Sequence, residues 1–166
     1  MALERSSPFL KGSAEFHSPL FSRTWTLVQG DAILAKAHRT VWRRTSKVVI
    51  TDGPTWEITP AGWGKLDVAD GDEVLARAER QGWLGHSWEI TSPRFGYFLT
   101  ARSMALRRWT IDLGDHPVVT LQGGKLSFNR LEVEAGAGVP LEVIMVSWHI
   151  IVRAWEAAAA AGAGGG

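Results

Sequence analysis

The sequence overlays itself without a gap when it is shifted by 41 residues, the distance from Gly30 to Gly71. The agreement is clearest between segments 30–42 and 71–83, which share the pattern Gly-Asp-x-x-Leu-Ala-x-Ala-x-Arg-x-x-Trp. A third and weaker copy begins at Trp109. A repeat of this length is typical of a fold that uses one small structural unit several times and buries its apolar face against its neighbours.

Each copy has the pattern of a β-meander. In the first copy, residues 25–28 alternate as a strand does, Gly30-Asp31 forms a turn and residues 33–39 run back. Strands are predicted at 25–28, 33–39, 47–51, 56–59, 65–68, 74–81, 87–91, 97–100, 106–112, 118–121, 125–129 and 131–134. About a dozen short strands in a chain of this length predict a closed or nearly closed antiparallel sheet.

The last segment has a helical pattern. Val139-Pro140 is predicted to open a helix, because Pro in the first turn lacks an N–H that would be unsatisfied anyway. The residues that follow are apolar around almost the whole axis, and a helix of that kind is buried on nearly every side. We therefore expect a mainly β fold, a closed antiparallel barrel of about twelve strands built from meander repeats, with a C-terminal hydrophobic helix threaded through it.

One domain is expected for 166 residues. Residues 1–21 are predicted to be an N-terminal lead-in segment, 22–161 the barrel with its central helix at 139–161, and 162–166 a flexible Gly-rich tail. The helix is the one stretch with the apolar character of a membrane span. Arg153 argues against spanning, because an Arg at the centre of a span costs about 2.5–3.5 kcal/mol.

The repeated strand pairs and the closing helix together resemble the tubby-like superfamily, within it the LURP-one-related and phospholipid-scramblase-like branch. The resemblance covers residues from about 22 to 160 and lies in pattern and topology. It implies a twelve-stranded barrel around a central helix. It also implies contact with membrane lipid, phosphoinositides in the tubby branch. The chain has no Cys-rich segment and no Pro-rich N-terminal region, so lipid scrambling is not expected.

The strongest local charge feature is a basic cluster with a tryptophan in it. Its members are Lys36, Arg39, Trp42, Arg43, Arg44 and Lys47. Guanidinium groups bind phosphate through two parallel hydrogen bonds, and Trp suits a membrane interface, so one interpretation is a site for anionic lipid headgroups. The other interpretation is a solvated hairpin loop whose charges protect a sheet edge.

A second feature is a polar stripe on the predicted helix. Glu142, His149, Arg153 and Glu156 fall within about 60° of one another around the helix axis. They form either a polar seam along a cavity, with His149 titrating near neutrality, or a set of buried groups satisfied by pairing. Most of the nine Trp are expected in the core, and an exposed Trp63 or Trp83 would be an interface anchor.

Composition excludes several classes of function. The chain has no Cys, which removes disulfides, zinc ribbons, Fe–S clusters and thiol nucleophiles. The formal net charge is +1, so nucleic acid is not an expected partner. The five His are scattered without metal-ligand spacing, and no nucleophile elbow or phosphate-binding Gly-rich loop occurs. No catalytic residue, metal or cofactor is assigned.

The prediction for function is a non-enzymatic binding module that contacts anionic membrane lipid through the basic loop. The alternative is a structural or protein-interaction barrel with a protein partner and no small ligand. An enzyme with a pocket around His149 and Arg153 ranks last, because nothing assembles a nucleophile, a base and an orienting group. The start of the chain has no signal-peptide pattern, so the expected location is the cytoplasm, peripheral at the membrane.

Overall fold

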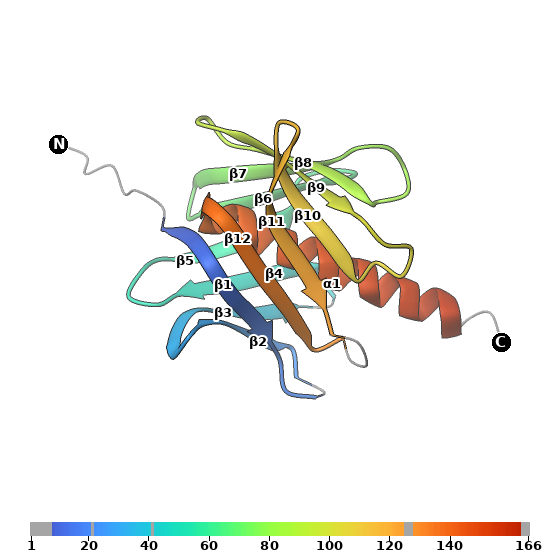
Figure 1. Ribbon diagram of the computed structural model, residues 1–166, viewed down its shortest axis with the longest axis horizontal. Helices are drawn as coiled ribbons and strands as arrows, with labels where there is room; N and C mark the ends of the chain where they lie inside the picture. Colours follow the sequence, from blue (N-terminus) through green and yellow to red (C-terminus); the bar gives the residue numbers. More distant parts are fainter. Residues whose placement is uncertain (1–7, 21, 41, 125–127, 164–166) are drawn as a thin grey trace.

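A computed structural model describes residues 8–20, 22–40, 42–124 and 128–163. Over these residues the chain forms a closed antiparallel β-barrel around one helix, as predicted (Figure 1). The strands are β1 (Phe9–His17), β2 (Thr24–Gln29), β3 (Ala32–Thr40), β4 (Thr45–Ile50), β5 (Thr55–Pro60), β6 (Lys65–Asp70), β7 (Glu73–Arg80), β8 (Ser87–Thr91), β9 (Gly96–Ala101), β10 (Arg108–Leu113), β11 (His116–Gly123) and β12 (Arg130–Pro140). The helix α1 is Leu141–Ala163.

The barrel is a continuous meander that closes on itself. Each strand pairs with the next along the chain, and β1 pairs with β12 to complete the circle. Closure leaves no free edge, which removes the need for basic residues to protect one. Residues 1–21 were predicted to lie ahead of the barrel, but β1 belongs to it. The register of β1 shifts between Leu10 and Gly12, and this irregularity breaks the alternation by which a strand is recognised.

Helix α1 runs along the interior of the barrel (Figure 1). All residues from 141 to 152 are buried, so the apolar surface of the helix is covered by strands. The repeated motif makes room for it. Ala35 and Ala37 on β3, and Ala76 and Ala78 on β7, point inward and are buried. Small side chains at these positions let a helix about 10–12 Å wide fit between the walls.

Two boundaries differ from the predictions. The helix begins at Leu141, and Val139 and Pro140 end β12, because they pair with Leu10 and Phe9 across the closing seam. The strand predicted at 125–129 falls partly on residues 125–127, which lie outside the described residues. Phe128 and Asn129 belong to the connection that precedes β12.

Tryptophans hold the helix in the barrel. The ring of Trp148 stacks on Phe16 with centroids 5.8 Å apart and meets the edge of Trp25 at 6.0 Å. Nearer the end of the helix, the indole N–H groups of Trp155 and Trp109 both donate to the carbonyl of Leu106, at 2.6 and 2.7 Å. Thus the helix is bonded to the β9–β10 connection as well as packed against the wall.

Candidate functional site

The antiparallel barrel places alternate connections at opposite ends. Six connections lie at the end where α1 leaves the barrel, which we call the helix-exit end. Their described residues are 18–20, 22–23, 42–44, 61–64, 81–86, 102–107, 124 and 128–129. In Figure 1, α1 projects past the barrel at this end, beside the β9–β10 connection. The turns 30–31, 51–54, 71–72, 92–95 and 114–115 lie at the opposite end.

The helix-exit end carries the most exposed apolar side chains of the molecule. Among the large apolar residues that the structure describes, every one that is 70% or more exposed lies in these connections: Leu20, Trp42, Trp63, Trp83, Leu84 and Met104. We call these six residues the apolar collar. They come from five different connections, so they surround the helix exit. Trp63 and Trp83, which were named from the sequence as interface anchors in the event that they are exposed, are both exposed.

The two ends also differ in charge. The six connections at the helix-exit end contain five Arg and no Asp or Glu. The turns at the opposite end contain one Arg, Arg94, and four Asp, namely Asp31, Asp52, Asp72 and Asp115. The barrel is therefore electrically polarised along its axis although its formal net charge is only +1.

The structure distributes the predicted basic cluster over three places. Lys36 on β3 and Lys47 on β4 point outward from the barrel wall. Trp42, Arg43 and Arg44 are exposed in the β3–β4 connection at the helix-exit end. The sixth member of the cluster, the Arg39 side chain, points inward. The cluster is therefore not one continuous patch, and only its three connection residues lie beside the collar.

Arg39 is buried and serves the fold. Both of its terminal nitrogens donate to the carboxylate of Glu156, one of them at 3.0 Å, and only 7% of the residue is exposed. This ion pair joins β3 to the last turns of α1. The carboxylate of Glu156, a member of the polar helix stripe, is thus satisfied by a strand residue that the sequence did not indicate as its partner.

Changing the two partners of this ion pair is expected to have unequal effects. Arg39→Met replaces a buried cation with an apolar chain of similar length, and Glu156, which is half exposed, returns to water. We expect a change within about 0.5 kcal/mol. Glu156→Ala leaves a buried cation without its partner and is expected to cost about 1–2 kcal/mol after solvent screening. Urea unfolding of both variants measures the difference, and equal losses would contradict this assignment.

The polar helix stripe is not one site. Glu142 and Glu156 are separated by 14 residues, about 21 Å along the axis. Glu142 is buried in the first turn, where its charge adds to burial in raising the pKa of Tyr97. His149 is buried in the middle of the barrel, where its Nδ1 lies 2.7 Å from the Ser46 hydroxyl. Arg153 and Glu156 reach the helix-exit end.

Nothing around His149 indicates catalysis. Burial lowers the pKa of His149 to about 3, and the positive charges of Arg39 and Arg153 contribute to the shift. Its partner Ser46 is itself buried and has no access to a substrate. A neutral His bonded to a buried Ser is a structural pair in the core of the barrel.

A cavity of about 490 Å³ opens beside α1 at the helix-exit end. Arg44, Arg80 and Arg153 line it, and the Arg80 guanidinium lies 4.3 Å from the centroid of the Trp63 ring. The sequence prediction missed the pairing of Arg80 with Trp63. Arg80 ends β7 and Trp63 lies in the β5–β6 connection, so no local sequence pattern predicts their contact.

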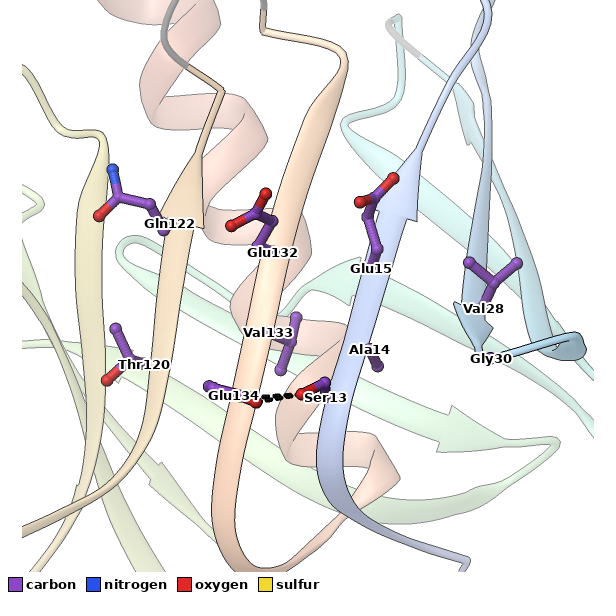
Figure 2. A pocket seen from close by; sticks show the side chains of 10 residues that line it. All are labelled: Ser13, Ala14, Glu15, Val28, Gly30, Thr120, Gln122, Glu132, Val133 and Glu134. Atoms are coloured by element: carbon purple, nitrogen blue, oxygen red, sulfur yellow. Dashed lines mark hydrogen bonds between the residues drawn. The ribbon is translucent and has the colours of Figure 1, made fainter.

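A larger hollow of about 720 Å³ lies on the outer wall of the barrel. Unlike the cavity at the helix-exit end, it is lined by acidic side chains. Figure 2 shows its carboxylates, Glu15 on β1 with Glu132 and Glu134 on β12. Glu134 accepts a hydrogen bond from the Ser13 hydroxyl, and Glu15 lies 3.1 Å from Arg130. Among the described residues, no group of three acidic or His side chains is placed to hold a metal ion.

By length and composition, residues 141–162 of the helix would suffice to cross a membrane. In this fold, however, much of that stretch is covered by the barrel wall. Its apolar character is explained by the core that it fills.

No family model matches the chain, and no curated protein matches it significantly. The X-ray structure of a protein from Arabidopsis thaliana, AT5G01750, has a similar fold, with a TM-score of 0.60. The match covers 86% of this chain and 91% of that chain at 11% sequence identity. At this identity the likeness shows the fold alone, a closed β-barrel with one apolar helix at the C-terminus.

Proposed function

We propose that this protein is a non-enzymatic module that docks by its helix-exit end on membranes containing anionic lipid, in keeping with its resemblance to the tubby-like and LURP-one-related proteins. One observation carries the proposal. The connections at a single end of the barrel combine the six residues of the apolar collar with arginines, and they contain no acidic residue.

The physical properties of this end suit a bilayer surface. Moving a large apolar side chain out of water contributes about 1.5–3 kcal/mol, and Trp is favoured at the level of the lipid headgroups. A cation near an anionic membrane contributes about 1 kcal/mol. Arg23, Arg43 and Arg44 are exposed here, and none of them makes an ion pair with a residue that the structure describes. The acidic turns of the opposite end would face away from the membrane.

The end of α1 points in the same direction. Residues 157–161 are exposed alanines that project beyond the barrel wall (Figure 1). They are small and uncharged, so they present no barrier to close approach of the collar to a surface. The docking surface is therefore the collar, the exposed arginines and the last turns of the helix.

Cosedimentation with vesicles tests the proposal. Binding is expected with phosphatidylcholine vesicles that contain phosphatidylserine, and it should weaken as salt rises. Replacing both Arg43 and Arg44 with Gln removes two cations from the surface and is expected to weaken binding roughly 30-fold. Replacing both Trp42 and Trp83 with Ala removes anchors and is expected to weaken it as well.

The matched control is the pair Lys36→Gln and Lys47→Gln, which removes the same charge from the outer wall. This variant is expected to bind nearly as well as the unmodified protein. An equal loss of vesicle binding in the Arg43/Arg44 variant and in the Lys36/Lys47 control would contradict docking by this end. Failure to bind the vesicles that contain phosphatidylserine would overturn the proposal and favour a barrel that binds a protein partner.

A further inference from the structure

We infer that the cavity beside the exit of α1 binds a phosphomonoester group, from a lipid headgroup or from a soluble phosphate ester. In its lipid form the inference rests on the proposed function, because the cavity opens at the docking end. The observations that carry it are the excess of arginine around the cavity and the fixed position of Arg80.

The cavity is lined by cations without matching carboxylates. Arg44, Arg80 and Arg153 line it, and no Asp or Glu does. Lys65 also lines it and is the one lining cation with a carboxylate in reach among the described residues, Glu79 at 3.9 Å. An anion entering the cavity would therefore meet three guanidinium groups that have no described carboxylate within ion-pairing distance, although the charge of Glu156 acts on Arg153.

The internal repeat offers a comparison, because the arginine at the matching position of the other copy does have a carboxylate partner. Arg39 and Arg80 are the matching arginines of the motif, and both point inward at the helix-exit end. Arg39 has Glu156 as its partner. Arg80 has no such partner in the described part of the chain. The Nε atoms of both arginines are buried without a hydrogen bond. The helix supplies one carboxylate at this end, and Arg39 uses it.

Arg80 is nevertheless held in place. Its guanidinium stacks on the Trp63 ring at 4.3 Å. A Cβ at Gly64 would approach the Arg80 side chain to 3.4 Å, and one at Gly85 to 3.8 Å, so two loop glycines border it closely. A guanidinium fixed by stacking loses little entropy when it binds an oxyanion.

The charge of the site matches a phosphomonoester better than a diester or a carboxylate. Burial lowers the pKa of the Arg153 guanidinium, and the charges of Arg44 and Arg39 lower it further against the opposing effect of Glu156, so these cations lie near one another. A phosphomonoester carries about −1.5 to −2 charge at pH 7 and offers three acceptor oxygens. A phosphodiester or carboxylate carries a single charge and neutralises the site less completely.

Two titrations test the inference. In the soluble arm, glycerol phosphate is titrated into the protein and Trp fluorescence is followed, with the diester glycerophosphocholine as the comparison ligand. In the lipid arm, vesicles containing phosphatidate are compared with vesicles containing phosphatidylserine at equal total charge. Binding of the monoester in either arm, in preference to its comparison, is the expected result.

The Arg80→Gln, Arg153→Gln double variant is expected to weaken monoester binding at least about tenfold, because it removes two charge-assisted contacts. Arg80→Lys keeps the charge but loses the planar fork, so it should recover only part of the affinity. Lys36→Gln, Lys47→Gln is the control and should leave monoester binding unchanged.

The outcomes separate this inference from membrane docking. Equal binding of phosphatidate and phosphatidylserine vesicles together with no response to glycerol phosphate would overturn the phosphomonoester site and leave docking intact. A response to glycerol phosphate without vesicle binding would support the site and contradict docking. Monoester binding that is unchanged in the Arg80→Gln, Arg153→Gln variant would overturn the assignment of the site to this cavity.

Discussion

Replacing Trp148 with Ala is expected to lower the free energy of unfolding by about 3–5 kcal/mol. Trp148 is fully buried on α1 and packs against Phe16 of β1 and Trp25 of β2. Its removal leaves a cavity between the helix and the seam where the barrel closes, and the walls cannot collapse into it without breaking strand pairing. Urea unfolding followed by circular dichroism measures the loss.

Trp83→Ala is the matched control. It makes the same truncation at a side chain that is 83% exposed, so its effect on stability should stay within about 0.5 kcal/mol. If Trp148→Ala does not fold, Trp148→Phe provides a milder measurement, because it keeps a ring against Phe16. Similar stability for Trp148→Phe, Trp83→Ala and the unmodified protein would show that the helix is not the packed centre of the barrel.

Acid is expected to destabilise the protein through His149. The pKa of His149 is about 3 in the folded protein, against 6.5 for an ordinary His. The unfolded chain therefore binds the extra proton first, and the free energy of unfolding falls as pH drops below 6.5. The contribution of His149 is fully present above that pH, and about 2 kcal/mol of it is lost between pH 7 and pH 5.

His149→Gln isolates this effect, because Gln does not titrate and can keep a hydrogen bond to Ser46. Stability should be measured at pH 7 and pH 5, a range above most carboxylate titrations. The unmodified protein is expected to lose more stability over this range than the variant. Parallel losses in both proteins would mean that the pKa of His149 in the folded protein is close to its value in the unfolded chain.

The barrel was predictable because its signals are local. Two copies of the Leu-Ala-x-Ala motif alternate with period two, and their alanines are the inward residues that give α1 room. The all-round apolar pattern of the helix predicted its burial in the same way. The total of twelve strands is confirmed, but one was misplaced, because β1 is irregular at Gly12 and the segment ending at Asn129 is not a strand where it is described.

The site was predicted only in pieces. Trp63 and Trp83 were named from the sequence as anchors if exposed, and Trp42, Arg43 and Arg44 do lie at the end that carries the collar. Their shared location could have been deduced from the sequence by counting alternate turns of a meander, which would have separated acidic turns from basic ones. Lys36 is exposed and Arg39 is buried, and this difference could be predicted only by working out which side of the strand each residue faces.

Local sequence patterns were enough to predict a barrel of repeated hairpins filled by an apolar helix, because strand alternation and helical periodicity are properties of neighbouring residues. The pairing of charges at the helix-exit end became clear only from the folded arrangement of strands and helix. Arg39 and Arg80 have the same place in the motif, but Arg39 meets Glu156, which is 117 residues away along the chain. Arg80 meets a Trp ring instead. Which carboxylate neutralises which cation depends on how far the threaded helix extends, and no local pattern contains that distance.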